Sequence, residues 1–451
     1  MIKAFLNILR IPELRNKLMF TIGALMLYRL GFQIPLPGIN TESLKAAAKV
    51  ASEKGAGLAE YMSLFSGGSL SQSSIFGLGI MPYISAAIIF QLLGTVVPSL
   101  RKMQEEGPAG YQKIQEYTRY ATVGLCLVQA IMMLTHFSNS ASAGASIVYP
   151  QMQGTALFWI SGVIGLSAGT IFLMWLGEQI DKYGLGNGVS LIITGGILAR
   201  MPWAITQIVN DFDITGNGRY GISTAVLLVV VFIVVIAGAV IITQGQRRIP
   251  IQQAKHTRGR RVFGGQKTFL PLRVNHGGVM PIIFASSLMM FPGQITKWAA
   301  GYFNNTPSWH TISGWFDPTS LTYILVYIMM IFFFSFFWTT VQFNPEKVSK
   351  QLRDSGSFVP GLRPGPRTAD YLENVMGRIT YAGAGFLALI AIVPTIVMKT
   401  TDIPYSVSAF LGGTGLLITV SVMLDFVQRI EAGLLMRNYD GFLGEGQKIR
   451  S

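Results

Sequence analysis

The sequence predicts an all-α polytopic membrane protein with ten transmembrane helices arranged as two inverted five-helix halves. Three observations support this fold class. The 451 residues are 50% hydrophobic and only 12% charged, whereas soluble domains carry about 25% charged residues. Lysine and arginine gather on one side of the predicted spans, and a four-residue motif recurs five spans along the chain.

Ten windows of about twenty mostly apolar residues can each cross a hydrocarbon core about 30 Å thick as a helix. The windows are 18–36, 75–97, 120–137, 156–177, 188–206, 222–243, 279–298, 321–341, 379–398 and 405–424. Glycine and proline occur inside several of them, which transmembrane helices tolerate.

The distribution of basic residues predicts the orientation. Ten spans put both termini on one side, and 27 loop lysines and arginines lie on that side against 6 on the other. Because basic loops stay in the cytoplasm, both termini are predicted to be cytoplasmic. Fourteen of the 27 lie in just two loops, 244–278 and 342–378, and topology alone does not explain that concentration.

A Gly-x-Met-Pro motif occurs at Gly79–Pro82 in span two and at Gly278–Pro281 in span seven. These spans run in opposite directions, so a repeat of five spans is inserted upside down, and the functional site of such folds lies between the halves. We therefore predict halves of residues 1–211 and 212–451. Each motif would begin a helix that faces the site, with proline in the first turn. Chance similarity between two apolar segments is the alternative.

The stretch before span two, Tyr61–Gly79, is half apolar, rich in serine and glycine, and uncharged. It is too short and too interrupted to span a membrane. We expect a re-entrant segment shielded by protein or water; a surface loop is the alternative.

Loop 244–278 carries eight basic residues and no acidic one. Apolar and β-prone residues flank Gly264-Gly265, which predicts a hairpin that turns at these glycines.

Loop 342–378 is predicted to contain a short helix over Pro345–Arg353, ended by Ser355-Gly356. Thr368 is predicted to cap the helix that leads into span nine. Between them, "VPGLRPGP" predicts a rigid turn that presents Arg363. Two structured basic loops favour an anionic partner, which could be RNA, an acidic protein face or lipid headgroups. A solvated surface is the alternative.

Several long motifs resemble the SecY family, the central pore subunits of the bacterial Sec protein translocase. They include "FSGGSLSQSSIFGLGIMPYISAAIIFQLL", "EYTRY", "FLMWLGEQI", "GLGNGVSLII", "GQRRI", "GRRVFGGQKTFLPLRVNHGGVMPIIFASS", "FNPEKVSKQLRDSGSFVPGLRPG" and "GGTGLLITV". The resemblance implies an hourglass-shaped protein-conducting channel in the bacterial inner membrane. Such a channel moves unfolded polypeptides across the membrane and releases hydrophobic segments sideways into lipid. It is not an enzyme, and we expect no cofactor and no metal.

By position, the resemblance implies a hydrophobic pore ring, a plug at about 58–74, a lateral gate and a cytoplasmic docking surface. The pore ring falls on Ile80, Ile84, Val189, Ile193, Ile283 and Ile418. The plug includes Tyr61, Met62, Leu64, Phe65, Ser66, Gly67, Gly68, Ser69 and Leu70. Polar groups at the lateral gate are Gln91, Gln129, Ser286 and Ser287. The docking surface includes Arg247, Arg248, Arg260, Arg261 and Arg363.

The implied partners are the small membrane subunits SecE and SecG, the SecA motor ATPase, and the ribosome with its rRNA. Signal sequences, nascent polypeptides and anionic lipids complete the set. The alternative function is a secondary transporter, which also uses inverted repeats but needs ionisable residues that converge at the midplane. The charges at the spans lie near helix ends or apart from one another; they are Arg29, Glu178, Arg200 and Asp425.

Overall fold

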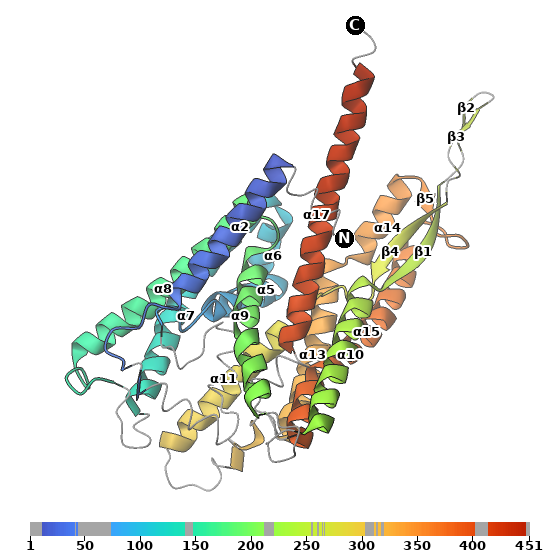
Figure 1. Ribbon diagram of the computed structural model, residues 1–451. Coiled ribbons are helices and arrows are strands. Elements are labelled where there is room, and N and C mark those ends of the chain that lie inside the picture. Colours follow the sequence, from blue (N-terminus) through green and yellow to red (C-terminus); the bar gives the residue numbers. More distant parts are fainter. Residues whose placement is uncertain are drawn as a thin grey trace. The chain divides into compact units, whose positions relative to one another are not determined.

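The structure is a computed structural model, and every predicted span window overlaps one of its helices (Figure 1). It describes residues 11–40, 42–43, 74–139, 148–211, 221–253, 256–258, 261–263, 265, 267–302, 311–312, 314–316, 320–401 and 414–447. Among these residues, six helices are long and apolar enough to cross a membrane. A seventh qualifies if α5 and α6 form one bent span. The fold is therefore that of a multi-pass helical membrane protein.

The chain divides into two compact units. The first contains α2 (Pro12–Gly31), α5 (Met81–Val96), α6 (Pro98–Glu105), α7 (Pro108–Asn139), α8 (Ala156–Tyr183), α9 (Gly188–Asp211) and most of α17 (Thr414–Gln447). The second contains most of α10 (Ile222–Gln244), strands β1 to β5, α11 (Met280–Tyr302), α13 (Leu321–Gln342), α14 (Pro345–Asp354) and α15 (Pro366–Thr401). The division into halves at residue 211 stays a prediction.

A hydrophobic core in the first unit holds the segment that leads into α5. Isolated β-bridges join Pro35 to Ser74 and Ile39 to Val148, so three connecting segments meet there. A Cβ at Gly169 would lie 2.2 Å from the Ile75 carbonyl oxygen, which shows how closely α8 approaches this segment. The buried core residues are Leu36, Ile39, Leu78, Ala130, Met133, Leu134, Phe137, Val148, Phe158 and Leu166.

The polypeptide bends sharply where α5 meets α6. The two helices are bent by 103° at Val97, whose backbone is extended and which precedes Pro98. A residue before proline is disfavoured in the helical conformation, so the sequence ends α5 at this point.

The second unit contains a three-stranded antiparallel sheet of the order β4-β1-β5. β1 (Gln246–Gln253) pairs along its length with β4 (Lys267–Arg273). β5 (Ser357–Phe358) pairs with the other edge of β1. Since β1 comes from loop 244–278 and β5 from loop 342–378, the two basic loops form one structure.

The hairpin predicted in loop 244–278 exists, but its predicted turn is wrong. β2 (His256–Arg258) pairs with β3 (Arg261–Phe263), and Arg258 lies opposite Arg261. Gly264-Gly265 follows β3 in the sequence and therefore does not lie between the two paired strands. The long β1–β4 pairing sets this register, because it aligns Gln252 with Lys267. Figure 1 shows the β2–β3 hairpin at the far end of the β1–β4 ribbon.

The sheet packs on the beginning of α15 through a shared hydrophobic core. This loop core contains the buried residues Ile249, Leu272, Val359, Leu372, Val375, Met376 and Ile379. Ile249 and Leu272 face it from β1 and β4, while Val359 follows β5. The basic loops are therefore a packed domain and not independent extensions.

The short helix of loop 342–378 is confirmed as α14, Pro345–Asp354. The Asn344 side chain caps it by accepting from the Lys347 N–H at 3.1 Å, and Gly356 follows with φ of 65°. The prediction that Thr368 caps the next helix is wrong, because α15 already begins at Pro366. The Thr368 hydroxyl instead donates to the Arg363 carbonyl oxygen at 2.9 Å.

Candidate functional site

Both Gly-x-Met-Pro motifs begin a helix in the same way. Gly79 has φ of 59° and Gly278 has φ of 60°, a left-handed conformation that glycine adopts without steric cost. Two residues later α5 begins at Met81 and α11 begins at Met280, each followed by proline in the first turn. The prediction that the motif starts both helices is confirmed.

The same equivalence extends to two predicted ring residues. The Ile84 N–H donates to the Ile80 carbonyl oxygen at 3.1 Å, and the Ile283 N–H donates to the Val279 carbonyl oxygen at 3.1 Å. Ile84 and Ile283 therefore occupy matching positions, five residues after the glycine.

All six predicted ring residues lie at the beginnings of helices. Ile80 and Ile84 belong to the start of α5, Val189 and Ile193 to α9, Ile283 to α11, and Ile418 to α17. Five are buried, while Val189 is half-buried. Their grouping around one constriction stays a prediction.

Among the polar residues predicted at the lateral gate, Ser286 and Ser287 are buried and Gln129 is half-buried. The Ser286 hydroxyl donates to the Ile283 carbonyl oxygen in its own helix at 2.9 Å. Within the described part of the chain, the Gln129 Nε2 atom and the Ser287 hydroxyl are buried without a hydrogen-bond partner. Gln91 is half-buried on α5. Unpaired buried donors of this kind are available for hydrogen bonds to another group. The assignment of these residues to a lateral gate stays a prediction.

The predicted plug residues Tyr61, Met62, Leu64, Phe65, Ser66, Gly67, Gly68, Ser69 and Leu70 lie outside the described residues. The re-entrant segment therefore stays a prediction.

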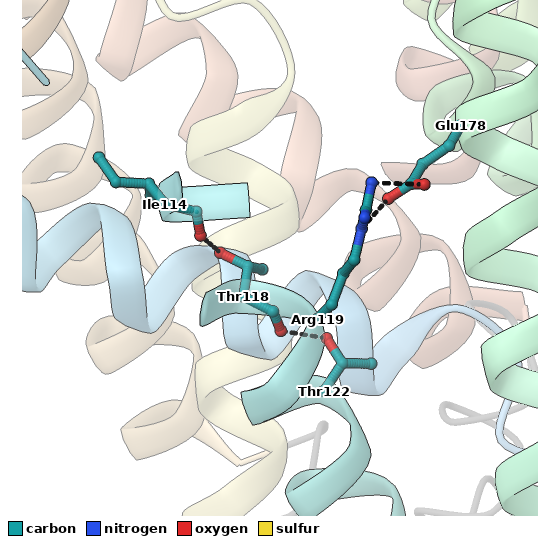
Figure 2. A network of polar contacts seen from close by, with 5 residues as sticks. All are labelled: Ile114, Thr118, Arg119, Thr122 and Glu178. Atoms are coloured by element: carbon teal, nitrogen blue, oxygen red, sulfur yellow. Dashed lines mark hydrogen bonds and ion pairs between the residues drawn. The ribbon is translucent and has the colours of Figure 1, made fainter. Parts of the chain in front are cut away.

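An ion pair that the sequence did not predict joins α7 to α8. Figure 2 shows the Arg119 guanidinium donating through Nε and one terminal nitrogen to the two carboxylate oxygens of Glu178, at 2.8 Å each. Nearby, the Thr118 and Thr122 hydroxyls donate to carbonyl oxygens of their own helix. A bidentate arginine–carboxylate pair fixes orientation as well as charge. The two residues are 59 positions apart, and only proximity in the fold reveals the pairing.

The arginines of the predicted docking surface lie on the domain that the two basic loops form. Arg247 and Arg248 are exposed on β1, Arg261 lies on β3, and Arg363 is exposed on the turn between β5 and α15. Arg260 lies outside the described residues. The structure thus brings arginines from both loops onto one domain.

A polar cluster joins the segment between β4 and α11 to the end of α13. The Gln342 amide, oriented by its partners, donates to the His276 carbonyl oxygen at 3.2 Å and accepts from the Trp338 indole nitrogen at 2.5 Å. The His276 ring packs edge-on against Phe343, with ring centroids 5.9 Å apart. Its Nδ1 atom is buried without a partner among the described residues. Burial, and to a smaller extent the charge of Arg273, lowers the pKa of His276.

The lowered His276 pKa predicts a loss of stability in mild acid. An unfolded histidine titrates near pH 6.5, so as pH falls below that value the unfolded chain binds the proton before the folded one does. Unfolding of the purified, detergent-solubilised protein should occur at a lower temperature at pH 5.5 than at pH 7.5. The His276→Gln variant should show a smaller difference between the two conditions. An unchanged difference in that variant would show that other groups cause the effect.

The sequence of this chain matches a known family over most of its length. The SecY family profile covers residues 74–427. The protein translocase subunit SecY of Haemophilus influenzae (strain ATCC 51907 / DSM 11121 / KW20 / Rd) is 40% identical over 432 residues, which cover 96% of this chain and 94% of that protein. The chain belongs to the SecY family. The region of this chain that the SecY profile matches includes every predicted ring, gate and docking residue. The predicted plug residues precede that region.

Solved structures share the SecY fold with this chain. One, described as the structure of a protein conducting channel, has a TM-score of 0.63 at 17% identity and covers 93% of this chain and 92% of its own. Another, of Sec61 in the canine ribosome-channel complex from the endoplasmic reticulum, has a TM-score of 0.59 at 17% identity with the same coverage. The fold is therefore that of the SecY and Sec61 channels.

Proposed function

We propose that this SecY-family chain forms a protein-conducting channel in the bacterial inner membrane. It moves unfolded secretory polypeptides across the membrane and releases hydrophobic segments sideways into lipid. The observation that carries the proposal is the matched start of α5 and α11, with Gly79 and Gly278 at φ of 59° and 60°. An inverted repeat puts its functional site between the halves near the bilayer centre, so Ile84 and Ile283 line that site.

The six ring residues form an apolar constriction in this channel. A narrow apolar ring excludes water and ions when it is empty, because dewetting closes such a gate without any charged group. Short hydrophobic side chains at helix starts can also move apart around a passing polypeptide. Ile80, Val189, Ile193 and Ile418 complete the ring that Ile84 and Ile283 define.

The remaining parts follow from orientation and from the family. Both termini lie in the cytoplasm, so the basic loop domain faces the cytoplasmic partners. The segment at about 58–74 is the plug that closes the outer funnel. Gln91, Gln129, Ser286 and Ser287 lie at the lateral gate, where interhelical hydrogen bonds worth about 0.6–2 kcal/mol each are weak enough for a signal sequence to replace.

The energy for translocation comes from partners of the channel. The exposed arginines Arg247, Arg248 and Arg363 suit carboxylates or phosphates, as found on the SecA motor or on the rRNA of a translating ribosome. SecE and SecG are the small membrane subunits of the complex, and anionic lipids surround its basic cytoplasmic face.

A secondary transporter is not favoured by the ion pairs of the first unit. Coupling to an ion gradient needs ionisable side chains that can release and rebind the ion near the midplane. Glu178 is held in the bidentate pair with Arg119, and Asp425 pairs with Arg429 one turn along α17 at 2.9 Å. Both carboxylates are therefore already neutralised by arginine.

Reconstitution tests the proposed function directly. Proteoliposomes that contain this chain with SecE and SecG should take up a radiolabelled preprotein into a protease-protected state when SecA and ATP are added. Liposomes without the chain are the control. Uptake of a small solute driven by an ion gradient, with no protected preprotein, would favour a transporter and contradict the channel.

A further inference from the structure

The backbone of the turn that carries Arg363 is anchored in the loop core on one side. Val359 is 5% exposed and belongs to that core, and Leu362 packs against it. The Leu362 N–H donates to the Val359 carbonyl oxygen at 3.0 Å. The residue immediately before Arg363 therefore has a fixed place.

Glycines give the turn freedom that its prolines do not remove. Pro360, Pro364 and Pro366 restrict their own φ angles. Gly361 has φ of 85° and Gly365 has φ of 139°, and glycine reaches many other conformations at little cost. Contacts outside the turn must therefore hold the peptide around Arg363 in one geometry.

Two buried hydroxyls supply contacts of this kind, beside the Thr368 and Ala369 N–H groups, which donate to the Gly365 carbonyl oxygen. Thr368, 1% exposed in the first turn of α15, donates to the Arg363 carbonyl oxygen at 2.9 Å. Ser349, 2% exposed on α14, donates to the Gly365 carbonyl oxygen at 2.7 Å. The two hydroxyls come from different helices and bind the carbonyl groups on either side of Pro364.

We propose that Ser349 and Thr368 are positioning residues that hold Arg363 in the geometry in which it binds a carboxylate on the cytoplasmic motor. The inference rests on the docking role of Arg363 given under the proposed function. A guanidinium recognises a carboxylate through two parallel hydrogen bonds, so its direction matters. A turn fixed in advance loses less conformational freedom on binding than a loose one does.

The test measures how preprotein translocation depends on SecA concentration. Thr368→Val keeps the shape of the side chain and removes its donor, and Ser349→Ala removes the other donor. Each should raise the SecA concentration for half-maximal rate about tenfold, equal to about 1.4 kcal/mol, with the maximal rate unchanged. Thr368→Ser retains the hydroxyl and should restore the wild-type concentration dependence.

Thr380→Val is the matched control. Thr380 is another buried threonine of α15, and its hydroxyl is within hydrogen-bond distance of the Thr339 hydroxyl at 3.1 Å, away from the turn. This variant should leave the half-maximal SecA concentration unchanged. A merely structural role for Thr368 would instead lower the maximal rate, and Thr380→Val would behave like Thr368→Val.

The outcomes separate the inference from the proposal on which it rests. If Arg363→Glu translocates normally, the docking role of Arg363 is wrong. If Arg363→Glu is impaired while Thr368→Val and Ser349→Ala retain the wild-type SecA dependence, docking stands and the positioning inference is overturned. A defect that Thr368→Ser does not restore also overturns it.

Discussion

Replacing Arg363 by glutamate should nearly abolish motor-driven translocation and leave insertion and folding of the channel intact. Losing one partner of a desolvated charge pair costs about 2–5 kcal/mol, which corresponds to at least about a 30-fold loss of affinity. Reversing the charge adds repulsion to that loss. The measurement is ATP-dependent import of a preprotein into vesicles that carry equal amounts of wild-type or variant channel.

The matched control is Lys350→Glu. Lys350 is exposed on α14 in the same loop, so both substitutions change the net charge of that loop equally. The positive-inside rule counts charge and not geometry, which makes the two variants equivalent for topology. The Lys350→Glu channel should therefore import preprotein at close to the wild-type rate. If the Arg363→Glu channel also imports at the wild-type rate, the basic residues of this loop serve only to set the membrane topology.

An intermediate result is expected for Arg363→Lys. Lysine keeps the charge but replaces the planar fork with a compact ammonium group. The Arg363→Lys channel should import preprotein more slowly than wild type and faster than Arg363→Glu. Equal rates for lysine and arginine would mean that charge alone is recognised.

Each hydropathy window overlaps a helix, but the windows did not predict where these helices begin and end. The window 120–137 marks the apolar part of α7, which begins at Pro108, and the window 405–424 precedes the polar continuation of α17 to Gln447. A hydropathy window responds to lipid-compatible residues only. A helix continues into water for as long as its backbone hydrogen bonds and caps support it, so its ends need local signals.

Local signals were reliable where the structure they specify is also local. The short helix predicted over Pro345–Arg353 agrees with α14 to within one residue, and the Gly-x-Met-Pro motif marked the start of α5 and α11. The Gly264-Gly265 turn failed because β1 and β4 set the hairpin register through pairing at a distance. Thr368 failed as a cap because Pro366 starts the helix two residues earlier.

The candidate site depended on contacts that no sequence pattern encodes. The bond from Ser349 to Gly365 spans 16 residues, and the Arg119–Glu178 pair spans 59. From the sequence alone, the polar residues of apolar helices cannot be told apart by their partners, because each of them is acceptable in a packed interior. Folding decides which of them meet, and so which of them can act.

Replacing both Ile84 and Ile283 by asparagine should make the resting channel leak ions. Burying an isoleucine side chain is worth about 1.5–3 kcal/mol relative to water, and an amide removes most of that preference for a dry environment. A change of about 1.4 kcal/mol shifts a wet–dry equilibrium about tenfold, so the double substitution should exceed this factor. Resting conductance in planar bilayers measures the effect, and the variant should also accept defective signal sequences.

The adjacent residue Ile282 distinguishes a pore wall from a packed core. Ile282 is 0% exposed and Ile283 is 3% exposed, yet consecutive helical residues point in different directions around the axis. In a packed core, an unpaired amide costs about 1–3 kcal/mol in addition to the lost burial. Ile282→Asn should therefore lower the yield and melting temperature of the complex without raising conductance. Ile84→Asn with Ile283→Asn should raise conductance at nearly normal stability, because water in the wetted pore hydrates both amides. Destabilisation of both variants with unchanged conductance would make Ile84 and Ile283 ordinary core residues and remove them from the ring.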